Sequence, residues 1–448
     1  MTTPTGFAGR LGARLGGIAR GEVSDAAVAA ARNRLFHALG VGLLSTALPP
    51  AAVAWRAVEG ATGECLVLGR SERTAADAAA FVNGVISHSS LQEDCGPGGL
   101  RDGSHPGTYV IPAALAAAES THASGRALLL GLIAGYEAVG QIGAVASPQV
   151  VARGYRPVAV MGPFGAAAGA GAVFEGADDE LASALTIAAN MSSGTTQGIF
   201  EGTMEPYIHA GVAARNGLLA ARLARAGAWT ARFGFEGEFG FFRAFGGDRL
   251  ESAEVADSDT YAIERLGTKR FAACLQNQLT VALLVNGFPA GVAAEQVERV
   301  VVRRPRGGTN GLDSPGVSRT PPFDNMLTAQ MSARFTAAAA LLGLAVDDPT
   351  FYQASYADPR VVGLAERIEL VPTDDGSVSV EVALQGGVPV VLADDLPDVL
   401  FPTDAEIRQN FLRRAQPFLG GRHEEVATMI DELTELDDVR TLTALLSR

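Results

Sequence analysis

The chain has 448 residues, of which 48% are hydrophobic and 19% are charged. This composition provides for a large buried core and excludes disorder over most of the length. The formal net charge of −14 argues against a nucleic-acid partner and against an anionic membrane surface, because both need a basic protein surface. It does not exclude an acidic substrate, since a local cluster of Arg, Lys and His can reverse the electric field inside a cleft.

The three cysteines, Cys65, Cys95 and Cys274, are far apart and form no CxxC pair. They suggest neither a zinc site nor a disulfide framework, and the first residues lack an apolar run of signal-peptide length. A cytoplasmic protein is therefore expected. Two apolar stretches, 127–146 and 158–174, are rich in Gly and Ala and are interrupted by Glu, Gln or Pro. They are predicted to be buried helices rather than membrane spans.

In chain order, residues 24 to about 230 are predicted to be almost wholly helical. Ser24 is a typical N-cap before apolar residues at helical spacing. Pro112 is a favourable first-turn residue, so a helix is expected to begin there. The last helix of this region ends with a basic turn followed by Gly227. Small residues on many helix faces permit close packing of these helices.

The pattern changes after about residue 265. The Val run at 296–305 predicts a strand, and 367–394 predicts two or three antiparallel strands joined by Asp-Asp-Gly and Gly-Gly turns. A single helix is expected between them at 325–344, and helices return after residue 403. The sequence thus predicts a mainly α protein, with a large all-α helical domain (1–265 and 396–448) and a smaller α+β lid domain (266–395).

The densest polar stretch, residues 83–107, lies between two predicted helices and contains His88, Glu93, Asp94 and His105. Two adjacent carboxylates buried together would raise one pKa, which suits a general acid or base. The alternative is a solvated surface loop, but the number of histidines favours a functional site. The loop has no HxH or HxxxH spacing, so the sequence offers little support for a metal.

Lys269 is the sole lysine among 35 basic residues. A lysine loses its proton when desolvated or beside another cation, whereas an arginine does not, so a proton-transfer site can require lysine at one position. The alternative is chance. Arg156, which precedes a Gly-rich helix, is a candidate anion contact. Tyr207 is placed at the N-terminal end of a later helix, which favours an anion.

Taken together, these stretches resemble the MmgE/PrpD family, which includes 2-methylcitrate dehydratases, cis-aconitate decarboxylases and iminodisuccinate epimerases. The hallmark pattern falls at Asn83, Gly84, His88, Asp94 and the "HPG" turn after Ser104. The resemblance continues in the right order through "GYEAVGQIG" and "GTKRFAACLQNQ" to "FPTDAEIRQNFLRRA". It implies a homodimer without cofactor or metal, with the active site between a large helical domain and an α+β lid.

By position, Lys269 matches the family's site lysine and His105 matches the histidine of its HP motif. The other pocket positions carry different residues here. Leu91 stands where the family has an aspartate, and Cys95 where it has a threonine. Arg156 and Cys274 each replace a histidine of the family, Pro206 replaces a lysine and Phe335 replaces a tyrosine. The changes remove charge and hydrogen-bond donors, so the resemblance implies a less polar substrate than a tricarboxylate.

The resemblance implies proton transfer, or loss of carbon dioxide, beside a carboxylate. Lys269 is expected to stabilise negative charge or transfer the proton, and His105 to act as general acid or base. Asp94 is expected to orient His105 or to replace the aspartate that is missing at Leu91. The remaining candidates, as substrate contacts, are Arg156, His88, Leu91, Cys95, Tyr207, Cys274 and Phe335. The expected substrate is a small carboxylate of specialised metabolism, and the enzyme a dehydratase, decarboxylase, isomerase or cyclase.

Two rival interpretations remain open. Because most pocket positions differ from the family, the chain is alternatively a catalytically silent member that serves in binding or as a structural partner. A metal-dependent hydrolase is the other alternative, which rests only on the histidines and carboxylates of the loop at 83–107.

Overall fold

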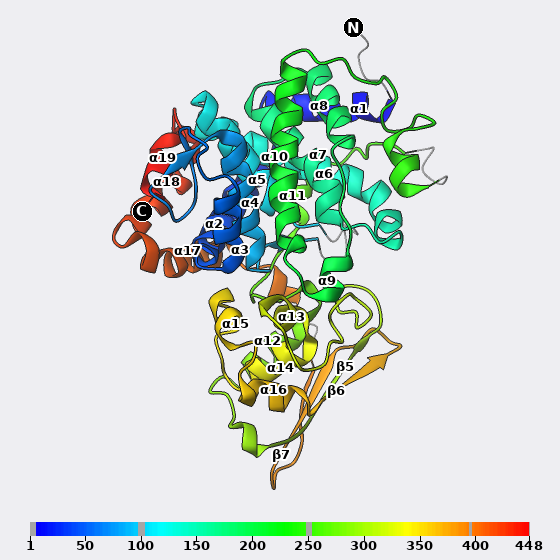
Figure 1. The fold of residues 1–448 in the computed structure, drawn as a ribbon, viewed down its shortest axis with the longest axis vertical. Coiled ribbons are helices and arrows are strands. Elements are labelled where there is room, and N and C mark those ends of the chain that lie inside the picture. Colours follow the sequence, from blue (N-terminus) through cyan, green and yellow to red (C-terminus); the bar gives the residue numbers. More distant parts are fainter. Residues whose placement is uncertain (1–5, 97–103, 248–252, 394–396, 448) are drawn as a thin grey trace.

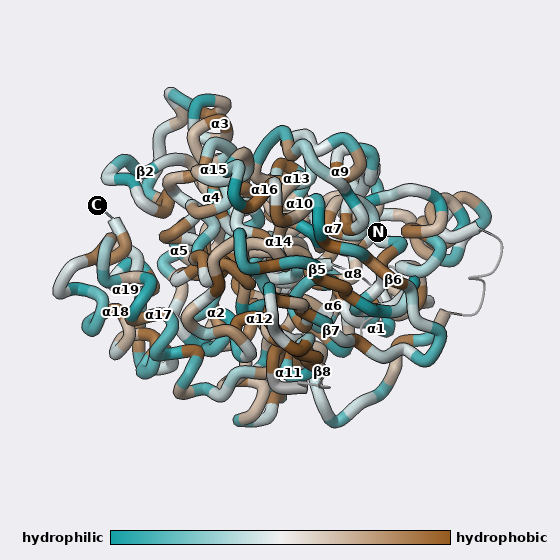
Figure 2. Tube along the Cα trace, turned by 90° about the horizontal axis from the view of Figure 1, so that it is seen from below, coloured by the Kyte–Doolittle hydropathy of each residue, from teal (hydrophilic) through white to brown (hydrophobic). Residues whose placement is uncertain are grey.

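The computed structural model describes residues 6–96, 104–247, 253–393 and 397–447. The fold is mainly α, with one small sheet in the C-terminal half, as the sequence predicts. Figure 1 shows a broad helical body from which a narrower lobe projects, and the β5–β7 strands lie in that lobe. Hydrophobic residues follow the elements in the middle of the molecule, and hydrophilic residues gather at outer turns (Figure 2).

The helical body is built from segments at both ends of the sequence. Its N-terminal helices are α1 (Gly6–Ala19), α2 (Asp25–Ser45), α3 (Pro49–Ala57), α4 (Ala76–Ser89), α5 (Gly107–Thr121), α6 (Gly125–Ala152), α7 (Pro157–Val173), α8 (Asp178–Ala189), α9 (Gln197–Glu201), α10 (Glu205–Arg225) and α11 (Ala262–Arg265). Its C-terminal helices are α17 (Asp404–Leu419), α18 (Arg422–Asp431) and α19 (Arg440–Leu445). They lie beside the N-terminal helices in Figure 1, where α17 packs against α2.

Glycine allows the central helices to approach closely. A Cβ added at Gly135 of α6 would lie 2.7 Å from the carbonyl oxygen of Gly165 in α7. A Cβ at Gly84 of α4 would lie 2.8 Å from the Cα of Gly211 in α10. Both distances are below van der Waals contact, so the backbones meet only because no side chain intervenes. Helix α6 is long and apolar enough to cross a membrane by composition, but 89% of its apolar window is buried in the fold.

Helix starts follow local capping in some places and tertiary contacts in others. Ser24 accepts a hydrogen bond from the Ala27 N–H, as expected of an N-cap. The prediction that a helix begins at Pro112 is wrong, because α5 begins at Gly107 and Pro112 lies inside it. There the Asp94 carboxylate, from the polar stretch that precedes the helix, accepts a hydrogen bond from the Gly107 N–H (3.1 Å).

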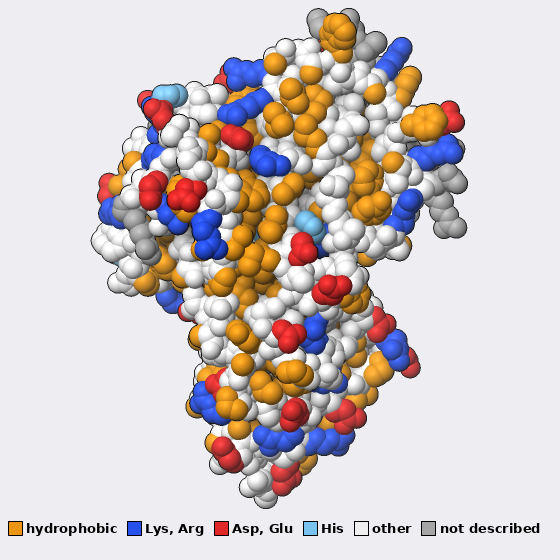
Figure 3. All heavy atoms as spheres, viewed as in Figure 1, with side chains coloured by type: hydrophobic (Ala, Val, Ile, Leu, Met, Phe, Trp, Pro, Cys, Tyr) orange, Lys and Arg blue, Asp and Glu red, His pale blue; other side chains and the backbone are white. Residues whose placement is uncertain are grey.

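The lobe contains a four-stranded sheet and five longer helices. The sheet consists of β5 (Val297–Pro305), β6 (Ile368–Thr373), β7 (Ser379–Leu384) and β8 (Val390–Ala393). The helices are α12 (Gln278–Gly287), α13 (Met326–Met331), α14 (Ala333–Leu341), α15 (Pro349–Ser355) and α16 (Pro359–Ala365). Figure 3 shows the lobe with acidic and basic side chains intermixed on the visible face.

Two details of the lobe differ from the sequence-based prediction. The strand order is β6-β5-β7-β8, so β6 pairs in parallel with β5 and does not form a hairpin with β7. The apolar Val run of β5 takes a central place because it is buried on both faces. The single helix expected at 325–344 is two helices, because Ser332 is extended (φ −71°, ψ 123°) and caps α14 by accepting from Phe335 N–H.

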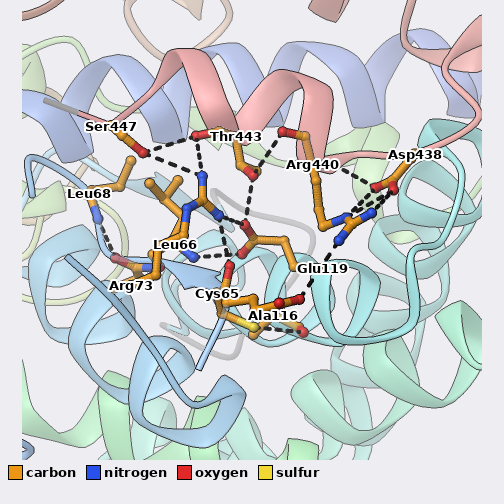
Figure 4. Close-up of polar contacts among 12 residues, drawn as sticks. Cys65, Leu66, Leu68, Arg73, Ala116, Glu119, Asp438, Arg440, Thr443 and Ser447 are labelled. Carbon is orange, nitrogen blue, oxygen red and sulfur yellow. Dashed lines mark hydrogen bonds and ion pairs between the residues drawn. The ribbon is translucent and has the colours of Figure 1, made fainter. Parts of the chain in front are cut away.

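A buried carboxylate ties the last helix to the body (Figure 4). Glu119 of α5 accepts hydrogen bonds from the Leu66 N–H (2.9 Å), Arg73 Nη1 (2.9 Å) and the Thr443 hydroxyl (2.6 Å). Its side chain is 1% exposed. The two-stranded sheet of β1 (Cys65–Leu66) and β2 (Arg73–Thr74) and helix α19 are therefore anchored at one point.

Glu119→Ala should lower the free energy of unfolding by about 3–5 kcal/mol, because it removes one partner of a largely buried ion pair and leaves two further donors unsatisfied. Urea denaturation monitored by circular dichroism measures this change. Glu64→Ala is the matched control, since Glu64 is exposed and its carboxylate lies 3.7 Å from Arg440 Nη1. Its effect should stay below about 1 kcal/mol. Equal effects of the two substitutions would contradict the anchoring role.

Candidate active site

A short two-stranded ladder joins the polar loop to the segment that carries Lys269. Strand β3 (Asp94–Cys95) pairs antiparallel with β4 (Gly267–Thr268), so Asp94 lies opposite Thr268. The Lys269 N–H continues the pairing by donating to the Glu93 carbonyl oxygen (3.4 Å). Residues that are about 175 positions apart thus become neighbours through main-chain hydrogen bonds.

The Lys269 side chain is 1% exposed and has two acceptors. Its Nζ donates to Glu93 Oε1 at 2.8 Å and to the Leu91 carbonyl oxygen at 3.1 Å. Leu91 has a left-handed backbone (φ 52°), an uncommon conformation for a non-glycine residue. Among the described residues these are the acceptors of Nζ, which leaves a third N–H of the ammonium group for a ligand.

Two histidines approach the same carboxylate oxygen. His88 Nδ1 lies 3.4 Å and His105 Nδ1 lies 3.5 Å from Glu93 Oε1, and the two imidazole centroids are 5.4 Å apart. Burial alone would raise the pKa of Glu93, but Lys269 and both histidines more than offset it, so this pKa lies well below its usual range. Glu93 is therefore a carboxylate at neutral pH, and Lys269 is its counter-ion.

Hydrogen bonding defines the tautomer of His105. Its Nδ1 lies 2.8 Å from the Asp94 carbonyl oxygen, which only accepts, so Nδ1 carries the proton. The Nε2 of the neutral ring then carries a lone pair. Burial, followed by the charge of Lys269, keeps the pKa of His105 well below its ordinary value. At neutral pH the ring is uncharged and able to accept a proton.

A cavity of about 190 Å³ lies beside these groups, between the helical body and the lobe. Lys269, His105 and Arg156 supply its basic groups, and Tyr155, Thr196, Gln276 and Ser314 also line it. Its apolar wall includes Leu91, Val151, Ile199, Leu275, Pro315 and Met331. Arg156 precedes α7, and its buried Nε has no hydrogen-bond partner among the residues that the structure describes. The cavity thus combines a base, a cation and an unpaired guanidinium with a largely apolar wall.

The carboxylate of Asp94 faces away from this cavity. It accepts hydrogen bonds from the Tyr136 hydroxyl and the Gly107 N–H, and it does not line the cavity. A Cβ at Gly107 would lie 3.0 Å from Asp94 Oδ2, which explains the glycine of the "HPG" turn. Asp94 does orient His105, but it does so through its main-chain carbonyl oxygen.

The remaining predicted site residues divide into two groups. Leu91 and Cys274 line the cavity. Tyr207 approaches the His88 ring (6.4 Å between centroids) and donates to Gln330 Oε1 at 3.0 Å, behind the cavity wall. Cys95 is buried in strand β3, where burial raises the pKa of its thiol to about 12.

Phe335 lies outside the cavity. Its ring is buried in the lobe against Phe323 (5.2 Å) and Tyr352 (5.8 Å), where it packs as a core residue. Pro206 is the first-turn proline of α10 and does not line the cavity either.

Glu93 is the residue that sequence reasoning left out of the site, although it is the point where Lys269, His88 and His105 meet. A signal was present, because a sole buried lysine needs a counter-ion and two adjacent carboxylates in a strand point to opposite faces. Which of the two faced the lysine depended on the β3–β4 register. Within the described residues, no group of His, Cys, Asp and Glu is arranged to hold a metal ion.

The histidine of α2 behind the site makes stability depend on pH. His37 Nε2 lies 2.7 Å from the Gln92 carbonyl oxygen, and burial, with Arg414, lowers the pKa of His37 to about 3. Unfolded histidine titrates near 6.5, so the unfolded chain binds more protons between pH 6.5 and about 3. The free energy of unfolding should therefore fall as the pH is lowered through this range.

His37→Gln should flatten this dependence, because glutamine keeps a donor for the Gln92 carbonyl and does not titrate. The measurement is urea denaturation at about pH 7 and about pH 4.5 for both proteins. His423→Gln is the control, since His423 is only partly buried and lies on the surface helix α18. If His37→Gln loses as much stability on acidification as the unmodified chain, the assignment of this dependence to His37 is wrong.

Comparison with known proteins agrees with this two-part construction. The MmgE/PrpD N-terminal domain model matches residues 11–253, and the MmgE/PrpD C-terminal domain model matches residues 271–395. The chain belongs to the MmgE/PrpD family, which confirms the resemblance found in the sequence. The family includes dehydratases and decarboxylases, which indicates an enzyme.

The cis-aconitate decarboxylase-like protein oryM of Aspergillus oryzae is similar to part of the chain, with 29% identity over 222 residues. The match covers 47% of this chain and 45% of that protein. The chain therefore spans less than half the length of this curated relative.

Proposed function

We propose that the chain is a cofactor-free lyase or isomerase that transfers a proton at the carbon next to a carboxylate or carbonyl group. The observation that carries this proposal is the convergence of the neutral His105 and the Lys269 ammonium on one cavity. A base and a fixed cation at the same small cavity are what the removal of such a proton requires.

In this mechanism His105 Nε2 accepts the proton from the carbon. The C–H electron pair moves toward the neighbouring carbonyl group, and the Lys269 ammonium stabilises the negative charge that develops on its oxygen. The pair then expels a leaving group on the next carbon in an elimination, or takes a proton back in an isomerisation. In a decarboxylation the C–C bond supplies the electron pair as carbon dioxide leaves, and the carbon then takes a proton from the Lys269 ammonium, which regains a proton from solvent.

Arg156 is the proposed anchor for the substrate carboxylate, because its buried Nε lacks a partner in the described part of the chain and a guanidinium forms bidentate pairs with carboxylates. Apolar residues make up much of the remaining wall, including Leu91 and Met331. These contacts favour a less polar acid than methylcitrate, such as an intermediate of specialised metabolism. A dehydratase, decarboxylase, isomerase or cyclase is compatible with them.

Solvent deuterium exchange tests the proposal on a range of acids at once. A panel of small mono- and dicarboxylic acids is incubated with the protein in D₂O and followed by proton NMR. The unmodified chain should incorporate deuterium next to a carboxylate, or release product, for at least one acid. His105→Gln should abolish this activity. Binding of an acid by both proteins, without exchange or turnover in either, would instead support a catalytically silent binding protein.

The family resemblance also underlies the proposal of a homodimer, and the three widely spaced cysteines underlie that of a cytoplasmic location. Large hydrophobic side chains are exposed on α10 and the segment after it, where Trp229 is 85% and Phe239 is 92% exposed. Such side chains supply an apolar surface for self-association. Light scattering coupled to size-exclusion chromatography measures the mass: twice the chain mass supports the homodimer, and the chain mass itself contradicts it.

A further inference from the structure

A second, larger cavity of about 450 Å³ lies on the other side of the Lys269 segment. Helix α17 forms one wall, and residues 268–271, 344–347 and His37 of α2 contribute to the others. Along α17, exposed Glu406 and Arg413 line it together with buried Ile407 and Arg414. The candidate active-site cavity and this second cavity have one lining residue in common, Lys269. The ammonium of Lys269 is bonded to Glu93.

Arg414 is the unusual member of this cavity. Its side chain is 5% exposed, and its Nε is buried without a hydrogen-bond partner. No hydrogen bond or ion pair to the guanidinium occurs within the described residues. Burial, with Arg413 next to it, lowers the pKa of Arg414 to about 10, so the group is still charged at neutral pH. An uncompensated buried charge is costly, and buried arginines are normally paired.

Of the other charged residues of the cavity, Arg413 and Glu406 are already paired, and Arg270 is exposed with its guanidinium 5.4 Å from the Phe271 ring. Arg413 lies 3.1 Å from Asp347. Glu406 accepts from the Thr403 N–H and hydroxyl, both at 2.8 Å, in the capping box of α17. The carboxylates of Asp347 and Glu406 are therefore not bonded to Arg414. Both would repel an anion that carries more than one charge.

We propose that this cavity binds a monocarboxylate with a short aliphatic chain, with the carboxylate paired to Arg414. A guanidinium donates two parallel hydrogen bonds to a carboxylate, which compensates the buried charge. The aliphatic part packs on the apolar walls, where Val285, Leu344 and Ile407 lie. The buried, unpaired guanidinium of Arg414 carries one positive charge and matches one negative charge, and the neighbouring Asp347 and Glu406 disfavour a phosphate dianion.

Isothermal titration with sodium butyrate, at constant ionic strength set with sodium chloride, tests this site. The unmodified chain should bind butyrate, and Arg414→Met should weaken the binding at least about tenfold. Arg408→Met is the control on the same helix, because Arg408 pairs with Asp431 and does not line the cavity. Arg156→Met removes the anion contact of the other cavity. Both of these variants should retain butyrate binding, which distinguishes this site from the proposed active site.

A second variant keeps the test decisive if Arg414→Met does not fold. Val285→Phe fills the cavity without changing charge, and it should also abolish butyrate binding while the circular dichroism spectrum stays unchanged. Inorganic phosphate serves as the competing probe. Butyrate binding that survives both Arg414→Met and Val285→Phe would overturn the proposal, as would no binding to the unmodified chain or a preference for phosphate over butyrate.

Discussion

Replacement of Lys269 by methionine should lower kcat/KM about 10³-fold on whichever acid the deuterium-exchange screen identifies. The ammonium is buried, fixed by two acceptors, and lines the same cavity as His105. Methionine has a similar length and no charge, so it removes the group that stabilises the anion as the proton leaves. Loss of one such preorganised donor costs about 10²–10³ in rate, and a lost proton-transfer role adds to that.

Two further variants make this result interpretable. Arg265→Met is the control, because Arg265 lies four residues before Lys269 and its side chain is exposed. This substitution should leave kcat/KM within about twofold of the value of the unmodified chain, as is usual for surface positions. Lys269→Arg separates the two roles of the lysine, because arginine keeps the charge and does not release a proton. Retained turnover in Lys269→Arg would assign charge stabilisation alone. Retained turnover in Lys269→Met would exclude Lys269 from the reaction.

Glu93→Leu should lower the free energy of unfolding by about 3–5 kcal/mol, the second large effect that the structure implies. The substitution leaves the Lys269 ammonium buried without a counter-charge, since the nearest remaining acceptor is the neutral Leu91 carbonyl. It also removes the charge that both histidines approach. Urea denaturation near pH 7 measures the loss.

The double variant Glu93→Leu with Lys269→Met provides the decisive comparison. If the cost of Glu93→Leu comes from an unpaired ammonium, removal of that ammonium should restore at least about 2 kcal/mol, so the two effects will not add. Additive losses would show that Glu93 stabilises the fold by some other contact. The pKa of Glu93 is well below 4.5, so its stabilisation should be complete above about pH 4.5 and be lost as the pH falls through the folded-state value.

Much of the fold could be predicted because local signals coincide with the tertiary structure. Helical periodicity with N-caps such as Ser24 predicted the helical region, and the Val run predicted β5. The errors fall where a side chain that accepts from the first N–H groups of a helix moves the helix start away from the position that residue preference predicts. Pro112 is a good helix starter, yet α5 begins earlier, where Asp94 accepts from Gly107. Ser332 breaks an apparently continuous helix by capping its second half.

In the candidate site, too, some residues could be predicted from the sequence and others could not. The loop histidines and Lys269 were identifiable from residue type, because few other residues in the chain carry that chemistry. Glu93 was not distinguishable from Asp94 by type, since both are carboxylates in adjacent positions. Glu93, just before β3, points toward Lys269, and Asp94 in β3 points toward Tyr136; the β3–β4 pairing, which continues from the Lys269 N–H to the Glu93 carbonyl oxygen, determines which. Phe335 illustrates the opposite case, a position chosen by resemblance that packs in the lobe core.

The sequence by itself determined the family, the mainly α fold and the presence of a single lysine beside a polar loop. These follow from residue types and their spacing, which are properties of the chain alone. Only the tertiary structure decided that Glu93 is the counter-ion of Lys269, that Arg156 and Arg414 line separate cavities, and that Arg414 has no partner in the described part of the chain. The physical reason is that pairing and desolvation of charges depend on distances between segments that are remote in sequence.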